Sequence, residues 1–329
     1  MPQDSTPSAD RVADRQRSIQ QSQDRKDGQQ QAQQEKSEGG VQAGAREYPA
    51  ELPAQHIDKP GHESELELKP KYMAPYYEGS NKLAGKVAVV TGGDSGIGRA
   101  VSVLYAREGA DVAIIYLNEH DDARETCRAV EAEGQRCLVI SGDVKDGEFC
   151  KDAVQQIVDT FGHVDILVNN AAFQEHASSI EDIDDTRLDE TLRTNVHGYF
   201  HMAKAVLPHL KQGDAIINTG SVVGLQGSAK LLDYAATKGA IHAFTKSLAS
   251  NLIDKGIRVN AVAPGPVWTP LNPADSPAEK VKEFGQQTDF KRAAQPEELS
   301  PAYVFLASPA CASYITGIVL PVTGSVGAI

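Results

Sequence analysis

The stretch that decides the fold is residues 86–98, Lys-Val-Ala-Val-Val-Thr-Gly-Gly-Asp-Ser-Gly-Ile-Gly. A short apolar run, 86–91, leads directly into a glycine-rich turn, and a helix-compatible sequence follows. Gly92, Gly96 and Gly98 have the spacing G-x3-G-x-G. Many glycine-rich loops are only turns. Between a buried strand and a helix, however, such a loop lets backbone amides approach a pyrophosphate, whose negative charge the helix N-terminus favours. The stretch therefore predicts the start of a dinucleotide-binding βαβ unit.

Further apolar runs of strand length follow this unit and alternate with amphipathic stretches of helix length. Continuous apolar strands separated by helices indicate a parallel sheet that is covered on both faces. With right-handed crossovers, we expect one doubly wound α/β domain of the Rossmann type, with seven strands, over residues 85–329. The six further runs are 112–116, 137–140, 165–169, 215–218, 257–262 and 318–322.

Residues 1–46 differ sharply from this domain. They are polar and rich in glutamine, and Met1, Val12, Ile19 and Val41 are their only large apolar side chains. Such a segment cannot bury enough apolar surface to offset its ordering entropy, so we expect it to be disordered.

Residues 47–84 form a third segment, in which five prolines are spaced among four tyrosines. Proline favours extended backbone, and the aromatic rings need a surface on which to lie. We expect an extended arm that lies over the globular domain or over a neighbouring subunit, with an unattached linker as the alternative.

The whole chain has 329 residues and a net charge of −13. An acidic balance argues against a nucleic-acid surface. No apolar signal-peptide core is present, and no run approaches about 18 apolar residues, so neither export nor membrane insertion is indicated. The four cysteines are too dispersed for a disulfide framework or a zinc site, and we expect a cytoplasmic protein. His197 and His201 have a metal-like spacing, but no nearby ligand completes a set, so we expect them to pack and no metal to bind.

Polar residues follow two more of the expected strands. Asp143 closes the third strand and Asn169–Ala172 closes the fourth. The carboxyl ends of parallel strands face the crevice in which open α/β sheets bind ligands. Asparagine is also suited to turns, and the glycine-rich loop upstream is what favours a binding site here.

Tyr234 and Lys238 lie four residues apart in a helix-compatible stretch, so both share one face. A tyrosine titrates near 10, and it exchanges protons at neutral pH only when a nearby cation stabilises its phenolate. The pair alone decides nothing, because chance produces it easily. Ser221, at the end of the fifth strand, has a hydroxyl suited to holding a substrate carbonyl. Asn195 lies in a helical stretch that begins near Asp185 and needs a partner, either a bound water or a backbone carbonyl.

The order of these motifs resembles the classical short-chain dehydrogenase/reductases. The proline-rich arm, the glycine-rich loop and residues 284–288 are similar to the glucose/ribitol dehydrogenase-like branch, which contains bacterial general-stress oxidoreductases and aldehyde reductases. The resemblance covers residues 85–329 and rests on Thr91–Gly98, Asn169–Ala172, Asn195, Ser221, Tyr234-x3-Lys238 and Pro264–Thr269.

The resemblance implies an NAD(P)-dependent oxidoreductase that transfers hydride between a nicotinamide cofactor and a small carbonyl or alcohol, such as an aldehyde, a sugar or a polyol. Tyr234 would be the general acid or base. Lys238 would lower the pKa of Tyr234 and bind the nicotinamide ribose. Ser221 would orient the substrate oxygen, and Asn195 would hold a water in a proton relay.

The resemblance also implies where the cofactor lies. Asp143 and Val144 would hold the adenine, Asn170 would contact the ribose side, and Thr269 with the Val267 backbone would meet the carboxamide. The full set of implied cofactor contacts is Gly92, Ser95, Gly96, Ile97, Gly98, Asp143, Val144, Asn170, Ala171, Tyr234, Lys238, Pro264, Gly265, Val267 and Thr269.

The choice between NADP and NAD stays open. Residues 116–118, at the end of the second strand, offer neither an acid nor a base, and Glu119, Asp121 and Asp122 lie just beyond. The resemblance favours NADP slightly. It also implies a homotetramer, in which the arm would contact a neighbouring subunit.

Residues 266–295, which contain Trp268, Leu271 and Phe284, are expected to cover the substrate site as a lid. The alternative function is a non-catalytic stress protein that uses the same fold for NAD(P) sensing or as a scaffold. Such proteins commonly lose the tyrosine or the lysine, whereas this chain keeps both.

Overall fold

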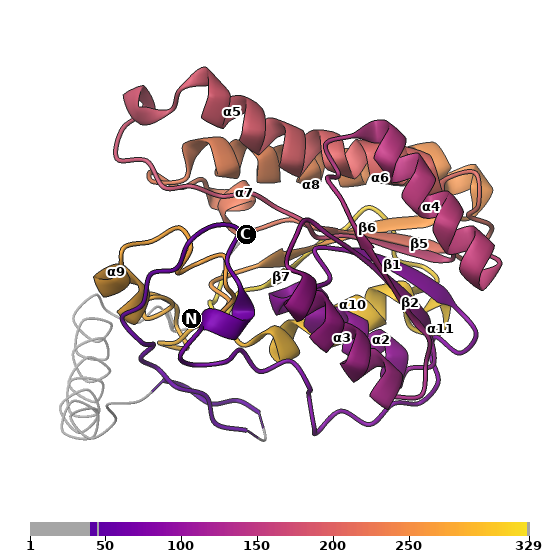
Figure 1. Ribbon diagram of the computed structural model, residues 1–329, viewed down its shortest axis with the longest axis horizontal. Helices are drawn as coiled ribbons and strands as arrows, with labels where there is room; N and C mark the ends of the chain where they lie inside the picture. The colour runs from indigo at the N-terminus through magenta and orange to yellow at the C-terminus, as the bar shows by residue number, and fades with distance from the viewer. Residues whose placement is uncertain (1–39, 45, 328–329) are drawn as a thin grey trace, which may run out of the picture. The chain divides into compact units, whose positions relative to one another are not determined.

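A seven-stranded parallel β-sheet forms the centre of the computed structural model (Figure 1), which describes residues 40–44 and 46–327. The strand order is β3-β2-β1-β4-β5-β6-β7, and every neighbouring pair is parallel. Each apolar run predicted as a strand is confirmed to within two residues at its ends. The strands are β1 (Val87–Thr91), β2 (Asp111–Tyr116), β3 (Cys137–Ser141), β4 (Ile166–Asn169), β5 (Ala215–Thr219), β6 (Arg258–Pro264) and β7 (Val319–Val322).

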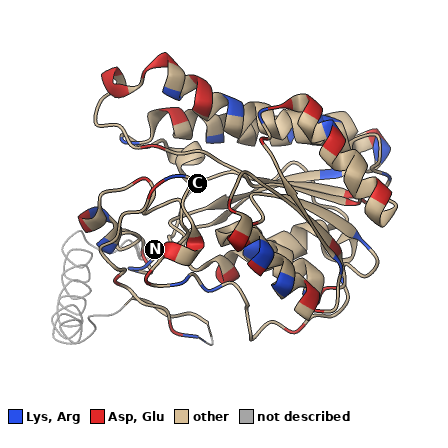
Figure 2. Ribbon diagram, viewed as in Figure 1, with Lys and Arg blue, Asp and Glu red and all other residues tan. Residues whose placement is uncertain are grey.

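Helices cover both faces of this sheet, as predicted. In Figure 1, α4, α6 and α8 lie over one face, and α2, α3 and α10 lie over the other. Charged residues lie mainly in the helices and loops and are sparse in the strands (Figure 2), as expected for a sheet without a solvent-facing side. The helices are α2 (Gly96–Arg107), α3 (His120–Ala132), α4 (Gly147–Phe161), α5 (Asp185–Leu192), α6 (Gly198–Val206), α7 (Val223–Gln226), α8 (Leu232–Leu252), α9 (Ala278–Lys282), α10 (Pro296–Ala307) and α11 (Pro309–Ala312), with short turns η1 (Glu63–Glu65), η2 (Ile180–Asp182), η3 (Arg193–His197) and η4 (Ile253–Lys255).

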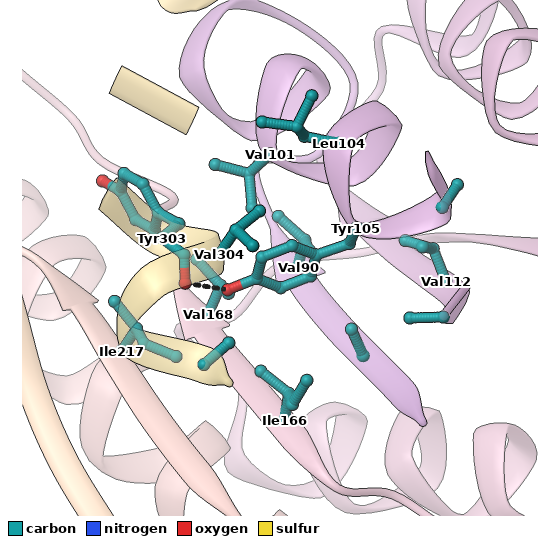
Figure 3. Packing of buried hydrophobic residues seen from close by; sticks show 14 of the residues in the cluster. Val90, Val101, Leu104, Tyr105, Val112, Ile166, Val168, Ile217, Tyr303 and Val304 are labelled. Atoms are coloured by element: carbon teal, nitrogen blue, oxygen red, sulfur yellow. Dashed lines mark hydrogen bonds between the residues drawn. The ribbon is translucent and has the colours of Figure 1, made fainter. Parts of the chain in front are cut away.

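Two apolar cores lie on the two faces of the sheet, because successive side chains of a strand point to opposite faces. In β1, Val87 and Val89 belong to the core beneath α4, α6 and α8, and Val90 belongs to the core beneath α2 and α10. Figure 3 shows this second core, in which the hydroxyl of Tyr105 donates to the carbonyl of Tyr303 at 3.2 Å. The result is the predicted doubly wound Rossmann-type fold.

The residues between 47 and 84 pack on the globular part of their own chain. A third apolar cluster joins Leu52, Ile57 and Leu66 of this arm to Trp268 and Val281. The segment contains a single helical turn, η1, and no strand. Most of the segment predicted to be disordered, 1–46, lies outside the described residues.

Candidate active site

A cavity of about 910 Å³ lies at the carboxyl ends of the strands. The strand order reverses between β1 and β4, and this is the point at which open α/β sheets bind ligands. The volume is in the range of cofactor and substrate pockets. Of the residues expected at a cofactor and substrate site, those that line this cavity are Gly92, Ser95, Gly96, Ile97, Asp143, Val144, Asn170, Ala171, Ser221, Tyr234, Lys238, Pro264, Gly265, Val267 and Thr269.

The glycine-rich loop owes its shape to positions where a side chain does not fit. Gly92 and Gly96 have φ values of 60° and 50°, which L side chains rarely adopt. A Cβ on Gly98 would lie 1.9 Å from the carbonyl oxygen of Gly92. Gly98 therefore packs the start of α2 against the turn and does not itself line the cavity.

Asn170 fastens this loop to the neighbouring strands. Its Nδ2 donates to the Gly92 carbonyl at 3.1 Å, and its Oδ1 accepts from the Thr219 hydroxyl at 3.2 Å. The Thr91 hydroxyl accepts from the backbone amides of Asn170 and Ala171 at 2.9 and 3.1 Å. The ends of β1, β4 and β5 are thus held together by hydrogen bonds within the protein.

Two acidic side chains line the same wall. Asp94, inside the glycine-rich loop, and Glu119, just after β2, are both buried at the cavity. Burial, reinforced by the negative charge of Glu119, raises the pKa of Asp94 to about 7. Asp94 was overlooked in the sequence because the spacing of the glycines, and not the residue between them, carries the loop motif.

Tyr234, Lys238 and Ser221 meet at the cavity. The first two lie one turn apart on α8 and are buried, as the spacing predicted. The Lys238 Nζ lies 5.3 Å from the centre of the Tyr234 ring and donates to the Thr219 carbonyl at 2.8 Å. Ser221 follows β5, lines the same cavity and lies close enough to Tyr234 to lower its pKa. The structure therefore brings together three residues that are 17 positions or fewer apart in sequence but come from two elements.

Burial dominates the ionisation of this pair. It raises the pKa of Tyr234, and the nearby charge of Asp275 adds to the effect, while the hydrogen bond from Ser221 opposes it. Burial also lowers the pKa of Lys238 to about 7. Loss of solvent therefore acts against the lowered Tyr234 pKa that the family resemblance implies.

Asn195 lies in η3, a single π-helical turn, and is fully buried. Its Oδ1 accepts from the Phe173 amide at 2.7 Å. Its Nδ2 donates to the Phe173 carbonyl at 2.9 Å and to the Thr237 hydroxyl at 3.0 Å. Of the two partners expected for Asn195, a bound water or a backbone carbonyl, the structure shows the backbone carbonyl. Asn195 does not line the cavity and lies behind its wall. Single π turns are frequent at functional sites.

The arm contributes to the cavity, which the sequence did not reveal. Lys59, Pro60 and Gly61 line it. The Lys59 Nζ donates to the carbonyls of Gln174 and Ala274 at 2.8 and 3.2 Å. A lysine that contacts residues more than 100 positions away leaves no local pattern in the sequence.

The lid segment, 266–295, is divided between two roles. Leu271 and Phe284 line the cavity, as expected for a cover. Trp268 does not, because its ring is buried in the cluster with Leu66 and its Nε1 donates to the Leu68 carbonyl at 2.8 Å. The tryptophan therefore joins the lid segment to the arm.

The sequence and the fold of this chain were compared with those of known proteins, and both are similar to members of one family. Residues 92–326 match the sequence model of a family described as enoyl-(acyl carrier protein) reductase. The fold is similar to the crystal structure of a short-chain dehydrogenase from Burkholderia cenocepacia J2315 in complex with NADP, with a TM-score of 0.69 and 33% identity over 74% of this chain and 98% of that one. The chain belongs to the short-chain dehydrogenase/reductase family.

Named relatives place this dehydrogenase/reductase near the predicted branch. It is 54% identical to general stress protein 39 of Bacillus subtilis (strain 168), over 84% of this chain and 97% of that protein. It is 50% identical to glucose and ribitol dehydrogenase of Daucus carota, over 83% and 95% of the two chains. It is 49% identical to NADPH-dependent aldehyde reductase 1, chloroplastic, of Arabidopsis thaliana, over 84% and 97%. The predicted family resemblance is confirmed.

The histidine pair of this dehydrogenase/reductase takes part in packing. The His201 Nδ1 lies 3.2 Å from the Val144 carbonyl, and the His197 and His201 rings meet edge to face with centroids 6.2 Å apart. Residues 40–44 and 46–327 contain no group of three side chains placed to hold a metal ion. In the same part of the chain, no helix is long and apolar enough to cross a membrane.

Proposed function

We propose that this dehydrogenase/reductase transfers hydride between NAD(P) and a small carbonyl or alcohol, with Tyr234 as the acid or base. One observation carries the proposal: Tyr234, Ser221 and Lys238 converge on the same cavity that the glycine-rich loop lines. The alternative, a non-catalytic sensor or scaffold, has no such support, because Tyr234, Ser221 and Lys238 are all present and line one cavity.

The cavity fits a dinucleotide in shape and chemistry. At Gly92 a Cβ would lie 3.0 Å from the Ala171 Cα, so the missing side chain lets the loop pack closely against the end of β4 at the cavity. Gly92 and residues 95–97 would hold the pyrophosphate, Asp143 and Val144 the adenine, and Val267 with Thr269 the carboxamide. When bound, the nicotinamide ring supplies or accepts the hydride.

Tyr234 would complete the reaction by moving one proton. In the reducing direction its phenol donates to the oxygen of the carbonyl as that oxygen gains negative charge. The Ser221 hydroxyl would hold the same oxygen and orient it. Lys238 would stabilise the resulting phenolate. Asn195, bound to the Phe173 backbone, would position the cavity wall beside Tyr234. Asn195 would also hold a water that relays the proton.

The relatives support NADP as the preferred cofactor. One is named an NADPH-dependent aldehyde reductase, and one similar solved structure holds NADP. Asp94 and Glu119 oppose this preference, because ionised carboxyls repel a 2′-phosphate and suit a free 2′-hydroxyl. The relative named general stress protein 39 supports a place for this activity in a stress response.

The test is a comparison of Tyr234→Phe with wild type in oxidation of NADPH and NADH across aldehydes, ketoses and quinones, with the reverse reaction on sugars and polyols. Loss of the proton donor is expected to lower kcat by about 100-fold or more. Tyr314→Phe is the matched control, because that tyrosine is fully exposed. If a folded Tyr234→Phe protein reduces carbonyls with the kcat of wild type, the proposal is wrong.

We also propose a cytoplasmic homotetramer. Phe200 on α6 stacks on Phe244, with the ring centroids 4.1 Å apart, and is still 44% exposed. Leu188 and Leu192 of α5 are exposed as well. Exposed apolar side chains in such a group are typical of subunit contacts. Tyr76 of the arm is 60% exposed and is the proposed contact with a neighbour. The four cysteines are free, which suits a reducing compartment.

Light scattering after size-exclusion chromatography is expected to give the mass of four chains. Phe200→Asp is expected to yield smaller species, because it places a charge in the apolar contact. A wild-type protein that elutes as a monomer at micromolar concentration contradicts the assembly.

A further inference from the structure

A second group of polar side chains lines the same cavity, apart from Tyr234, Ser221 and Lys238. Gln174 and His176 follow β4 and reach the cavity wall. Behind them lies Asp275, from the lid segment, whose side chain is fully buried. Neither the glycine-rich loop nor the proton transfer uses these residues.

Asp275 is surrounded by hydrogen-bond donors. It accepts from the Gln174 Nε2 at 2.6 Å and from the His176 amide at 2.7 Å, and the buried Nδ1 of His176 lies against its Oδ2. Burial alone would raise the pKa of Asp275, but these donors outweigh it and hold the pKa below its ordinary value. The group is therefore a carboxylate at neutral pH.

The carboxylate orients the imidazole. A ring nitrogen beside a carboxylate carries a hydrogen, so the Nδ1 of His176 is turned to Asp275 and Nε2 is the ring nitrogen left to bond elsewhere. The side chain is 33% exposed and borders the cavity. Among the described residues, no protein atom hydrogen-bonds to Nε2, so its partner must come from water or a ligand.

The backbone that carries His176 is held from two sides. Lys59 of the arm donates to the Gln174 carbonyl at 2.8 Å, and Arg187 of α5 donates to the His176 carbonyl at 2.9 Å. Arg187 also pairs with Asp233 at 3.0 Å, and Asp233 immediately precedes Tyr234 on α8. The imidazole is thus fixed relative to Tyr234 through one arginine, as a preorganised binding group requires.

We propose that the Nε2 of His176 forms a hydrogen bond with a second hydroxyl of the substrate, beyond the reacting oxygen. This inference rests on the proposed hydride transfer and narrows its substrates to hydroxylated carbonyls and the corresponding polyols. A site built to bind a hydroxyl discriminates against an analogue that lacks it, because the polar group of the site is then left unpaired.

Two substrates of equal chain length test the proposal, glyceraldehyde and propanal, which differ in their hydroxyls. Wild type is expected to prefer glyceraldehyde. His176→Phe is expected to lose at least about 10-fold in kcat/KM on glyceraldehyde, mainly through KM, and to keep its kcat/KM on propanal within about 2-fold. His176→Gln retains an acceptor and is expected to recover part of the loss on glyceraldehyde.

The controls separate this proposal from the function on which it rests. Cofactor affinity, measured by fluorescence titration, is expected to be the same in wild type and both variants, which shows that the variants are folded. An equal loss on the two substrates, or no loss on either, overturns the role of His176 while hydride transfer stands. If wild type reduces neither aldehyde and no other carbonyl with either cofactor, the proposed function fails and this inference fails with it.

Discussion

Asp94 is the residue whose chemistry bears most directly on cofactor choice. It lies between the glycines of the loop, it lines the cavity, and its pKa of about 7 puts its charge change at physiological pH. An ionised carboxyl at the adenosine end repels the 2′-phosphate of NADP, and a protonated carboxyl does not. NADP is therefore expected to bind more weakly above pH 7, where Asp94 is charged, than below pH 7.

We predict that the preference of wild type for NADPH over NADH rises as the pH falls from 8 to 6. Asp94→Asn has no charge to lose, so at pH 8 its preference is expected to exceed that of wild type by about 10-fold, the effect of about 1.4 kcal/mol. The measurement is the ratio of kcat/KM for the two cofactors at each pH. The 2′-phosphate of NADPH also titrates in this range. Because Asp94→Asn lacks the carboxyl, the pH dependence that remains in this variant is that of the phosphate. Equal ratios for the two proteins at pH 8 would refute the role of Asp94.

Single residues also show the limit of sequence reasoning. The spacing of Gly92, Gly96 and Gly98 predicted the loop, because a missing side chain has a local consequence. The pKa of Lys238 was not predictable, since it depends on burial by residues from other elements. Asn195 was predicted to need a hydrogen-bond partner. The sequence could not identify this partner, because it is the backbone of residue 173, which only the tertiary structure brings next to Asn195.

At the scale of elements, the arm caps a helix that belongs to the cofactor loop. Ser95, at the N-cap of α2, makes no capping bond with its side chain. Instead the Glu63 carboxylate accepts from the Gly96 amide at 2.8 Å and pairs with Arg99 at 2.6 Å. Asp122 accepts from the Glu63 amide at 2.7 Å. The arm therefore stabilises the loop by an anion at the positive end of the helix.

We predict that Glu63→Gln destabilises the protein by about 2 kcal/mol, because it removes the closer of the two carboxylates that pair with the buried Arg99, at 2.6 Å against 3.5 Å for Asp122. The measurement is the free energy of unfolding from denaturant titration. Glu65→Gln is the matched control, two positions away and exposed, and is expected to change stability by about 0.5 kcal/mol or less. Similar losses in both variants would show that the contact with Arg99 does not matter.

The strands and the arm differed in how well the sequence predicted them. All seven strands were predicted, because burial on both faces requires continuous apolar runs that can be read locally. The prolines and tyrosines of the arm predicted an extended segment that needs a surface. Which surface it takes depends on pairs such as Glu63 with Arg99 and Lys59 with residue 174, for which the sequence has no local signal.

At the scale of the molecule, the topology assembles the site. The strand order places the end of β1 beside that of β4, and the loop after β1 meets α8 residues more than 130 positions later in the chain. The order of motifs predicted that Ser221, Tyr234 and Lys238 would line one cavity, since a doubly wound sheet gathers strand ends at one edge. The contribution of the arm and the buried place of Trp268 came only from the tertiary structure.

The most direct test of hydride transfer uses NADPH deuterated at the transferring position of C4, with glyceraldehyde or another accepted carbonyl as substrate. Wild type is expected to place one deuterium on the carbinol carbon of the product, detected by mass spectrometry, and Tyr234→Phe is expected to form this product at least about 100-fold more slowly. Reduced product without deuterium, or equal rates of deuterium transfer by the two proteins, would contradict hydride transfer with Tyr234 as the proton donor.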